Sequence, residues 1–205
     1  MRNNELINLG FLTYSELRNE LTRQISISDV SVLNEIDRKR YDLCRLNYQR
    51  TTRLEKTFIP EDETIQIFSL IDKIQTWVVI TETWCGDSAQ NIPVIAKLAR
   101  LSDKINLKFV LRELNPEFMN TYLTNGARSI PKLIAFDDNE KEIFSWGPRP
   151  EAAQKIYADL KSTGLEKSFI NKELHFWYGR NRGKEVEREM KELIEKILSA
   201  STVKL

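Results

Sequence analysis

The side chains with the most distinctive chemistry lie in the segment Trp84-Cys85-Gly86-Asp87-Ser88. Its cysteine stands between a short apolar run and the start of an expected helix, where free N–H groups and a partial positive charge gather. A thiolate of Cys85 would be stabilised there and would be a nucleophile near neutral pH. The carboxylate of Asp87 opposes this effect, because a nearby negative charge disfavours a thiolate. The segment therefore predicts a reactive thiol whose net pKa depends on the fold.

Few other side chains could support catalysis or bind a metal. The chain has two cysteines, Cys44 and Cys85, and one histidine, His175. A structural zinc site takes four Cys or His ligands and a disulfide scaffold takes several cysteines, so neither is expected. Cys44 is predicted to be buried, which is usual for a free cysteine. Residues 175–178 are His-Phe-Trp-Tyr, an aromatic stretch that is typical of packing rather than of a site.

Composition and charge narrow the classes of partner. The 205 residues carry 31 Lys and Arg against 30 Asp and Glu, a net charge of +1. A balanced charge lacks the excess of basic residues that is typical of proteins that bind nucleic acid or an anionic membrane. The first six residues lack the apolar core of a signal peptide, and no run is long enough to span a bilayer. We therefore expect a soluble cytoplasmic protein with neither nucleic acid nor a membrane as partner, in a compartment where thiols stay reduced.

The helices and strands that must position Cys85 can be predicted from the spacing of apolar residues and from the residues that interrupt helices. Helices are expected from about Thr13, from Ser28 or Asp29 to about Thr57, and after Pro60. The middle of the chain then alternates between short apolar strands and helices. Strands are expected at 77–81, 106–112, 132–136 and 142–146, and helices at 87–101, 116–123 and 150–163. The last forty residues read as helical again.

This order predicts an α/β fold, with a central mixed sheet flanked by helices and extra helices at both ends. We divide the chain into an N-terminal helical extension packed on the core (1–60), a central domain (61–163) and a C-terminal helical extension (164–205). The terminal helices are expected to pack on the centre, because no flexible linker separates them from it.

Several motifs together resemble the thioredoxin-like family. Trp84-Cys85-Gly86 matches the start of that family's active site, and Pro93 matches the proline that kinks its active-site helix. Ser129-Ile130-Pro131 stands where the family carries a cis-proline that faces the active cysteine, and Gly147 matches another family glycine. The resemblance covers about 62–163 and implies a thioredoxin-like fold. The helical additions are similar to those of a bacterial subfamily, of which this chain would be a Trp-Cys-Gly-Asp-Ser variant.

Two departures from the family pattern change the expected mechanism. The second active-site cysteine is replaced by Ser88, and the buried acid beneath the site by Val79. A dithiol reductase needs that second thiol to expel its product, so Ser88 cannot complete the usual cycle. The resemblance then implies a single-cysteine protein whose mixed disulfide is resolved by an external thiol, with Cys44 as another candidate. The substrate would be a protein or a low-molecular-weight thiol, and glutathione is a possible co-substrate. No cofactor and no metal are expected.

The expected site residues have distinct roles. Cys85 and Ser88 are the candidate catalytic pair, with Ser88 as a hydrogen-bond donor to the thiolate. The candidate substrate-binding residues are Trp84, Gly86, Asp87, Ile130 and Pro131, and backbone groups at Ile130 would pair with a bound peptide. Arg128 and Lys132 flank this edge and would attract an acidic group, or would simply be solvated. The alternative function is a redox-inactive thioredoxin-fold module that holds a protein partner in the same groove.

Overall fold

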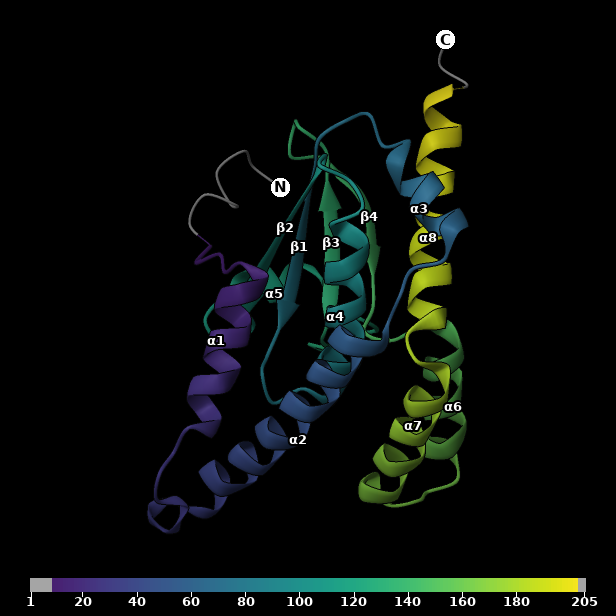
Figure 1. Ribbon diagram of the computed structural model, residues 1–205. Helices are drawn as coiled ribbons and strands as arrows, with labels where there is room; N and C mark the ends of the chain where they lie inside the picture. The colour runs from purple at the N-terminus through teal and green to yellow at the C-terminus, as the bar shows by residue number, and fades with distance from the viewer. Residues whose placement is uncertain (1–8, 203–205) are drawn as a thin grey trace.

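A computed structural model describes residues 9–202, with a four-stranded mixed sheet surrounded by helices (Figure 1). The strands are β1 (Gln75–Thr81), β2 (Ile105–Leu111), β3 (Lys132–Phe136) and β4 (Glu142–Trp146). The helices that interleave with them are α4 (Gly86–Ala99), α5 (Pro116–Thr121) and α6 (Glu151–Ser162). The added helices are α1 (Tyr14–Ile25), α2 (Glu35–Thr57), α3 (Asp62–Ser69), α7 (Lys167–Asn181) and α8 (Lys184–Thr202). The expected α/β fold class is confirmed.

The sheet has the strand order β2-β1-β3-β4. β1 and β2 are parallel, and Val79 is paired with Phe109. β3 is antiparallel to both β1 and β4, as expected for a hairpin between 132 and 146. The parallel β1–α4–β2 unit brings the carboxyl end of β1 directly to the first turn of α4. Cys85 therefore lies at a strand-to-helix junction beyond the carboxyl end of an inner strand.

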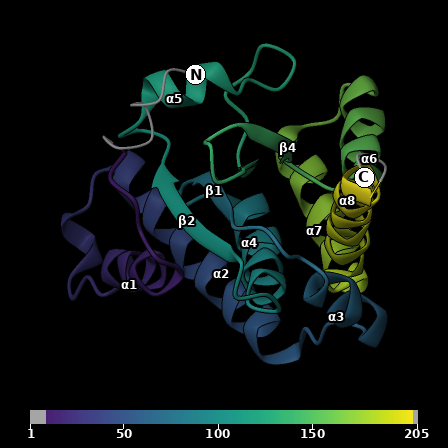
Figure 2. The same ribbon diagram turned by 90° about the horizontal axis from the view of Figure 1, so that it is seen from above.

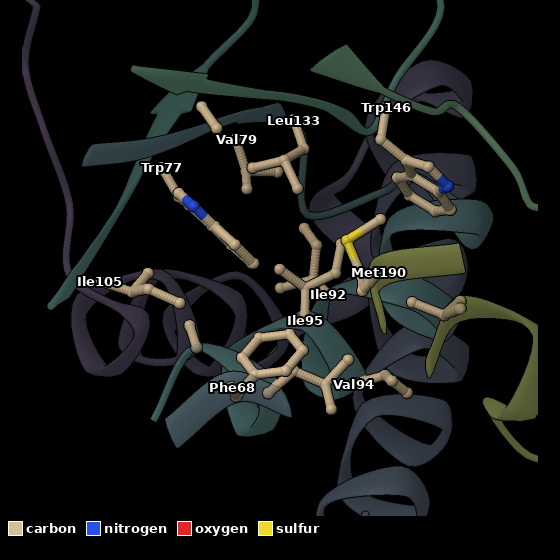
Figure 3. Close-up of a cluster of buried hydrophobic side chains, with 14 of the residues drawn as sticks. Phe68, Trp77, Val79, Ile92, Val94, Ile95, Ile105, Leu133, Trp146 and Met190 are labelled. Atoms are coloured by element: carbon tan, nitrogen blue, oxygen red, sulfur yellow. The ribbon is translucent and has the colours of Figure 1, made fainter. Parts of the chain in front are cut away.

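β1 is buried on both faces, as its uninterrupted apolar run predicts. Its side chains alternate between two clusters, because successive residues of a strand point to opposite faces. Trp77 and Val79 join the larger cluster beneath α4, whereas Val78 and Ile80 join the cluster beneath α5. Figure 3 shows Trp77 and Val79 above the apolar side chains of α4. Figure 2 shows α5 on the side of the sheet opposite α2 and α4.

The added helices extend the larger cluster. α2 packs along α4, and α8 packs against both α3 and α4. Leu54 and Phe58 of α2 and Met190 and Ile194 of α8 are buried in this cluster. α6 and α7 form a helical pair with its own small core around Leu174. In Figure 1, α1 lies on one side of α4, and α6, α7 and α8 lie on the other.

Most element boundaries agree with the sequence prediction, and α2 is the exception. The capping box of Thr13 and Glu16 is present at the start of α1. The prediction that Ser28 or Asp29 begins the second helix is wrong, because α2 begins at Glu35 with Asn34 as its cap. Asp29 instead accepts a hydrogen bond from the Ser31 N–H and caps a short 3₁₀ turn, Val30–Val32.

The sequence also led us to expect neither a signal peptide nor a membrane-spanning helix. The residues on which the absence of a signal peptide was argued, 1–6, lie outside the described part of the chain. Within residues 9–202, no helix combines the length and the apolar character needed to cross a bilayer.

Candidate functional site

Cys85 is the N-terminal cap of α4. Its backbone is extended (φ −76°, ψ 119°), and its sulfur accepts a hydrogen bond from the Ser88 N–H at 3.5 Å. β1 delivers the residue to this position, and the Cys85 N–H donates to the Glu82 carbonyl in the tight connection between strand and helix. The sequence thus places the thiol on the free N–H groups of a helix terminus, as predicted.

The Ile130–Pro131 peptide lies opposite the thiol. The bond is cis, and the Cys85 thiol donates to the Ile130 carbonyl oxygen at 3.3 Å. Gly147 follows β4 with φ +106°, and a Cβ there would lie 2.3 Å from the Pro131 carbonyl oxygen. Only glycine therefore lets this loop pack behind Pro131, which is itself buried. Two segments far apart in the sequence therefore meet at the sulfur, and a third, at Gly147, packs against Pro131.

The thiol is buried and protonated in this arrangement. Cys85 is 8% exposed. Burial first, and then the charge of Asp87, raise the pKa of the Cys85 thiol to about 11, against the opposing hydrogen bonds from Ser88. The sequence left the net pKa of this thiol open, and in this arrangement the pKa is raised because burial outweighs the stabilisation at the helix terminus.

Ser88 lies beneath the thiol. Its hydroxyl accepts a hydrogen bond from the Thr81 hydroxyl at 2.8 Å, so its own proton is available to the Cys85 sulfur. Ser88 is buried and borders a small internal cavity with Thr81 and Ile92 rather than the open groove described below. It can act on the sulfur but cannot touch a ligand outside.

Asp87 is held in a buried ion pair. Its carboxylate lies 2.7 Å from an Nη atom of Arg149 and accepts a hydrogen bond from the Tyr178 hydroxyl at 3.0 Å. Burial raises the pKa of Asp87, and the Arg149 guanidinium opposes this. Tyr178 also receives a hydrogen bond from the Asn91 amide. This network ties the first turn of α4 to the loop before α6 and to α7.

His175 lies over Gly86. A Cβ on Gly86 would be 2.8 Å from the His175 Nε2, so a glycine is required for this approach. The ring is half-buried, and its Nδ1 is 3.4 Å from the Gln90 amide. Burial first, and then the charges of Arg50 and Arg149, lower the pKa of His175 to about 3. The imidazole is therefore neutral near pH 7 and is a packing group beside the thiol.

A groove of about 830 Å³ opens beside Cys85. Its floor includes Trp84, Cys85, Gly86, Asp87 and Ile130, so five of the seven expected site residues border it. Its walls come from α2, from the loop before β3, from the loop before α6 and from α7.

Three further residues near the groove were expected to matter, and each has a clear place. The Trp84 ring lies 5.0 Å from the guanidinium carbon of Arg112. Arg128 borders the groove, as expected for a cation at this edge. Lys132 instead borders a separate hollow with Tyr122 and Glu142.

Cys44 is buried, as predicted, at 1% exposure. Its thiol donates to the Gln24 side-chain oxygen at 3.1 Å, and burial raises its pKa. Both cysteines are free thiols. Among residues 9–202, no group of three or more His, Cys, Asp or Glu side chains is placed to hold a metal ion.

Sequence reasoning missed the contribution of α7 to this site. His175 and Tyr178 are one helical turn apart, which places both on the face that covers Cys85's neighbours. Their aromatic stretch was interpreted as packing, which holds for the buried Tyr178, whereas Phe176 is exposed at the groove. Nothing in the stretch indicates that it lies against the active-site loop. Arg50 and Arg149 were missed for the same reason, since only the fold brings them to the groove.

Comparisons with known proteins agree with this geometry. A family profile described as thioredoxin matches residues 39–161. No curated protein matches the chain. A crystal structure of a protein of unknown function from Pseudomonas aeruginosa is similar, with a TM-score of 0.52 and 15% identity over 92% of this chain and 99% of that one. An HIV epitope-scaffold is also similar, with a TM-score of 0.53 and 16% identity over 90% of this chain and 99% of that one. At these identities the two structures support the fold alone.

Proposed function

Because the chain belongs to the thioredoxin family, we propose that it is a thiol–disulfide protein that acts through Cys85 alone. The position of the Cys85 sulfur carries this proposal. It caps α4, faces the Ile130–Pro131 peptide and borders the groove. A disulfide in the groove would meet one thiol, since Ser88 stands where a second cysteine would be needed for internal release.

The reaction consists of two exchange steps. In the first, Cys85 loses its proton to solvent and its thiolate attacks a disulfide R–S–S–R. A bond forms between Cys85 and one sulfur, and the other sulfur leaves as a thiolate. In the second, the thiolate of an external thiol attacks the substrate sulfur of this mixed disulfide and Cys85 leaves as a thiolate. The net change is exchange of R–S⁻ for the external thiol, and Cys85 is regenerated.

The other site residues act on this sulfur or on the ligand. The Ser88 N–H and hydroxyl stabilise the Cys85 thiolate in both steps. Trp84, Gly86, Asp87 and Ile130 border the space that the substrate half occupies, and Pro131 holds Ile130 against the sulfur. The external thiol would be glutathione or a protein thiol, and the need for reduced thiol would accord with a cytoplasmic location.

The test is formation and release of a mixed disulfide. A Cys44→Ser protein is treated with oxidised glutathione between pH 7 and pH 10, and intact mass is followed. We expect one adduct on Cys85, formed faster as pH rises, and lost when a thiol is added. A Cys44→Ser/Cys85→Ser protein should give no adduct. An absence of adduct across the whole pH range, with the protein folded, would rule out the redox function.

A second candidate function is supported by one specific observation. Cys85 is 8% exposed, and burial raises the pKa of its thiol to about 11, so little thiolate is present at pH 7. A redox-inactive module that holds a partner in the groove would not need that thiolate. Cys85→Ser separates the two functions, because it abolishes exchange and leaves ligand binding largely intact.

A further inference from the structure

The groove beside Cys85 is strongly cationic. Its lining includes six cationic side chains and one carboxylate, that of Asp87. The cations are Arg50, Arg112, Arg128, Arg149, Lys167 and Lys172. Because the whole chain carries a net charge of only +1, this excess marks a local separation of charge.

Four of these cations have no carboxylate partner within ion-pair distance in the described part of the chain. Arg50 donates to the Asn47 side-chain oxygen, and Arg128 donates to the Asn120 side-chain oxygen. The Lys172 ammonium lies 5.8 Å from the Phe176 ring. Lys167 is exposed at the start of α7. Some half-buried cations elsewhere do have a carboxylate partner, as Arg18 has Glu55 at 3.0 Å.

Arg50 is the most informative of the four. It is half-buried beside Gly86, and burial lowers its pKa to about 10. Burying a guanidinium that has no ion-pair partner lowers the stability of the fold. Such a group is therefore expected where it can bind an anion. The carboxylate near Arg50 is that of Asp87, which already pairs with Arg149, and Arg53 adds a second positive charge nearby. The field at the floor of the groove therefore remains positive.

Apolar side chains border the same groove. Leu43 and Leu46 of α2 and Phe176 of α7 are exposed there. The volume of about 830 Å³ is within the range of sites for small ligands. A fitting ligand therefore has carboxylates, some apolar surface and the size of a short peptide.

We propose that this groove selects disulfides that carry carboxylates, so that an acidic small thiol is the exchange partner of Cys85. This inference rests on the proposed function for its chemistry and names the substrate class. The cations attract the anion and also stabilise the thiolate that leaves when Cys85 attacks. A neutral or cationic disulfide would react more slowly with the same sulfur.

The test compares three disulfides with one Cys44→Ser protein. Oxidised glutathione is anionic, hydroxyethyl disulfide is neutral and cystamine is cationic. Each rate is divided by the rate of the same disulfide with free mercaptoethanol. We expect the normalised rate of the anion to exceed that of the cation about tenfold or more at low salt, and the ratio to shrink in high salt.

Charge variants locate the effect. Arg128→Gln or Arg50→Gln should lower the ratio of anionic to neutral rate about threefold each. Arg180→Gln is the matched control, because Arg180 is an exposed α7 residue outside the groove. Circular dichroism confirms that each variant is folded. Equal normalised rates for the three disulfides would overturn the charge selection while leaving the thiol function intact.

A non-reactive ligand keeps the inference testable if Cys85 forms no adduct at all. S-methylglutathione carries the carboxylates but cannot form a disulfide, and its binding can be followed by NMR. Binding that weakens with salt and with Arg128→Gln would support the cationic site. Absence of binding at low salt, together with no adduct, would overturn both proposals.

Discussion

Asp87→Asn should lower the pKa of the Cys85 thiol. Burial is the larger cause of the raised value of about 11, and the charge of Asp87 is the next. The substitution keeps the shape of the side chain and removes its charge. Arg149 keeps its charge, so its field at Cys85 is the same before and after the substitution. The loss of the Asp87 charge therefore favours the thiolate of Cys85.

The size of the shift follows from Coulomb's law. Residues two apart in a first helical turn hold their side chains at about 6 Å, and a unit charge at that distance contributes about 3 kcal/mol at an effective dielectric constant of 20. Arg149 contributes the same field before and after the substitution, so the expected fall is about two pKa units. The thiolate fraction then rises about a hundredfold, and its nucleophilicity falls about tenfold. The net rate below the pKa should rise about tenfold.

The assay is alkylation of Cys85 by iodoacetamide in the Cys44→Ser background, from pH 7 to pH 11, followed by intact mass. Asp159→Asn is the matched control, because its carboxylate has an ion pair of the same 2.7 Å length, with Lys155, on the surface of α6. Its curve should coincide with that of the parent. Circular dichroism at each pH confirms that the protein remains folded.

A second control separates the effect of the Asp87 charge from the effect of a loosened contact between α4 and α7. Tyr178→Phe removes a hydrogen bond to Asp87 but leaves its charge in place. If the charge acts directly, Tyr178→Phe should leave the Cys85 titration at or above that of the parent. The reasoning is refuted if Asp87→Asn leaves the midpoint unchanged, or if Tyr178→Phe lowers it equally.

Three further predictions concern stability. Gly147→Ala should cost about 3 kcal/mol or more in urea unfolding, because its Cβ meets a backbone oxygen at 2.3 Å, whereas Gly126→Ala, with open space and φ +76°, should cost about 1 kcal/mol. His175 has its pKa lowered to about 3 by burial first, so the unfolded state binds a proton below about pH 6.5 and the folded state does not. Stability relative to His175→Gln should therefore fall by about 2 kcal/mol from pH 7 to pH 5, and an unchanged difference would contradict the burial of a neutral ring. Phe68→Ala should lower the free energy of unfolding by about 3–5 kcal/mol, because Phe68 is fully buried. Leu70→Ala should lower it by under about 0.5 kcal/mol, because Leu70 is 60% exposed. Equal losses for the two variants would contradict the packing of α3.

The parts of the fold that depend on local signals could be predicted. The β-branched run of β1 indicates a strand buried on both faces, and the alternation of Val78 and Val79 between two clusters shows it. The capping box of α1 fixes its start because both of its hydrogen bonds lie within four residues. Asp29 misled the prediction of α2 because its side chain satisfies a nearby N–H in a 3₁₀ turn rather than in a helix.

The covering of the site could not be predicted, because it depends on contacts between distant residues. Tyr178 reaches Asp87 across 91 positions of sequence, and His175 reaches Gln90 across 85. The cationic groove was hidden by the near-zero net charge, which sums over the whole surface. Of its six cations only Arg128 was singled out, since it neighbours the Ile130–Pro131 motif in sequence.

Two opposing effects on Cys85 have different origins in the chain. The helix terminus that favours a thiolate is local, encoded by β1, Cys85 and the first turn of α4. The burial that disfavours it comes from distant segments, because Cys85 packs in the cluster that contains Ile130, from the loop before β3, and Phe118 of α5. Asp87, which Tyr178 and Arg149 hold in place, adds its negative charge. The pKa of this thiol is therefore raised by non-local packing and by one carboxylate, against a helix terminus that the local sequence encodes.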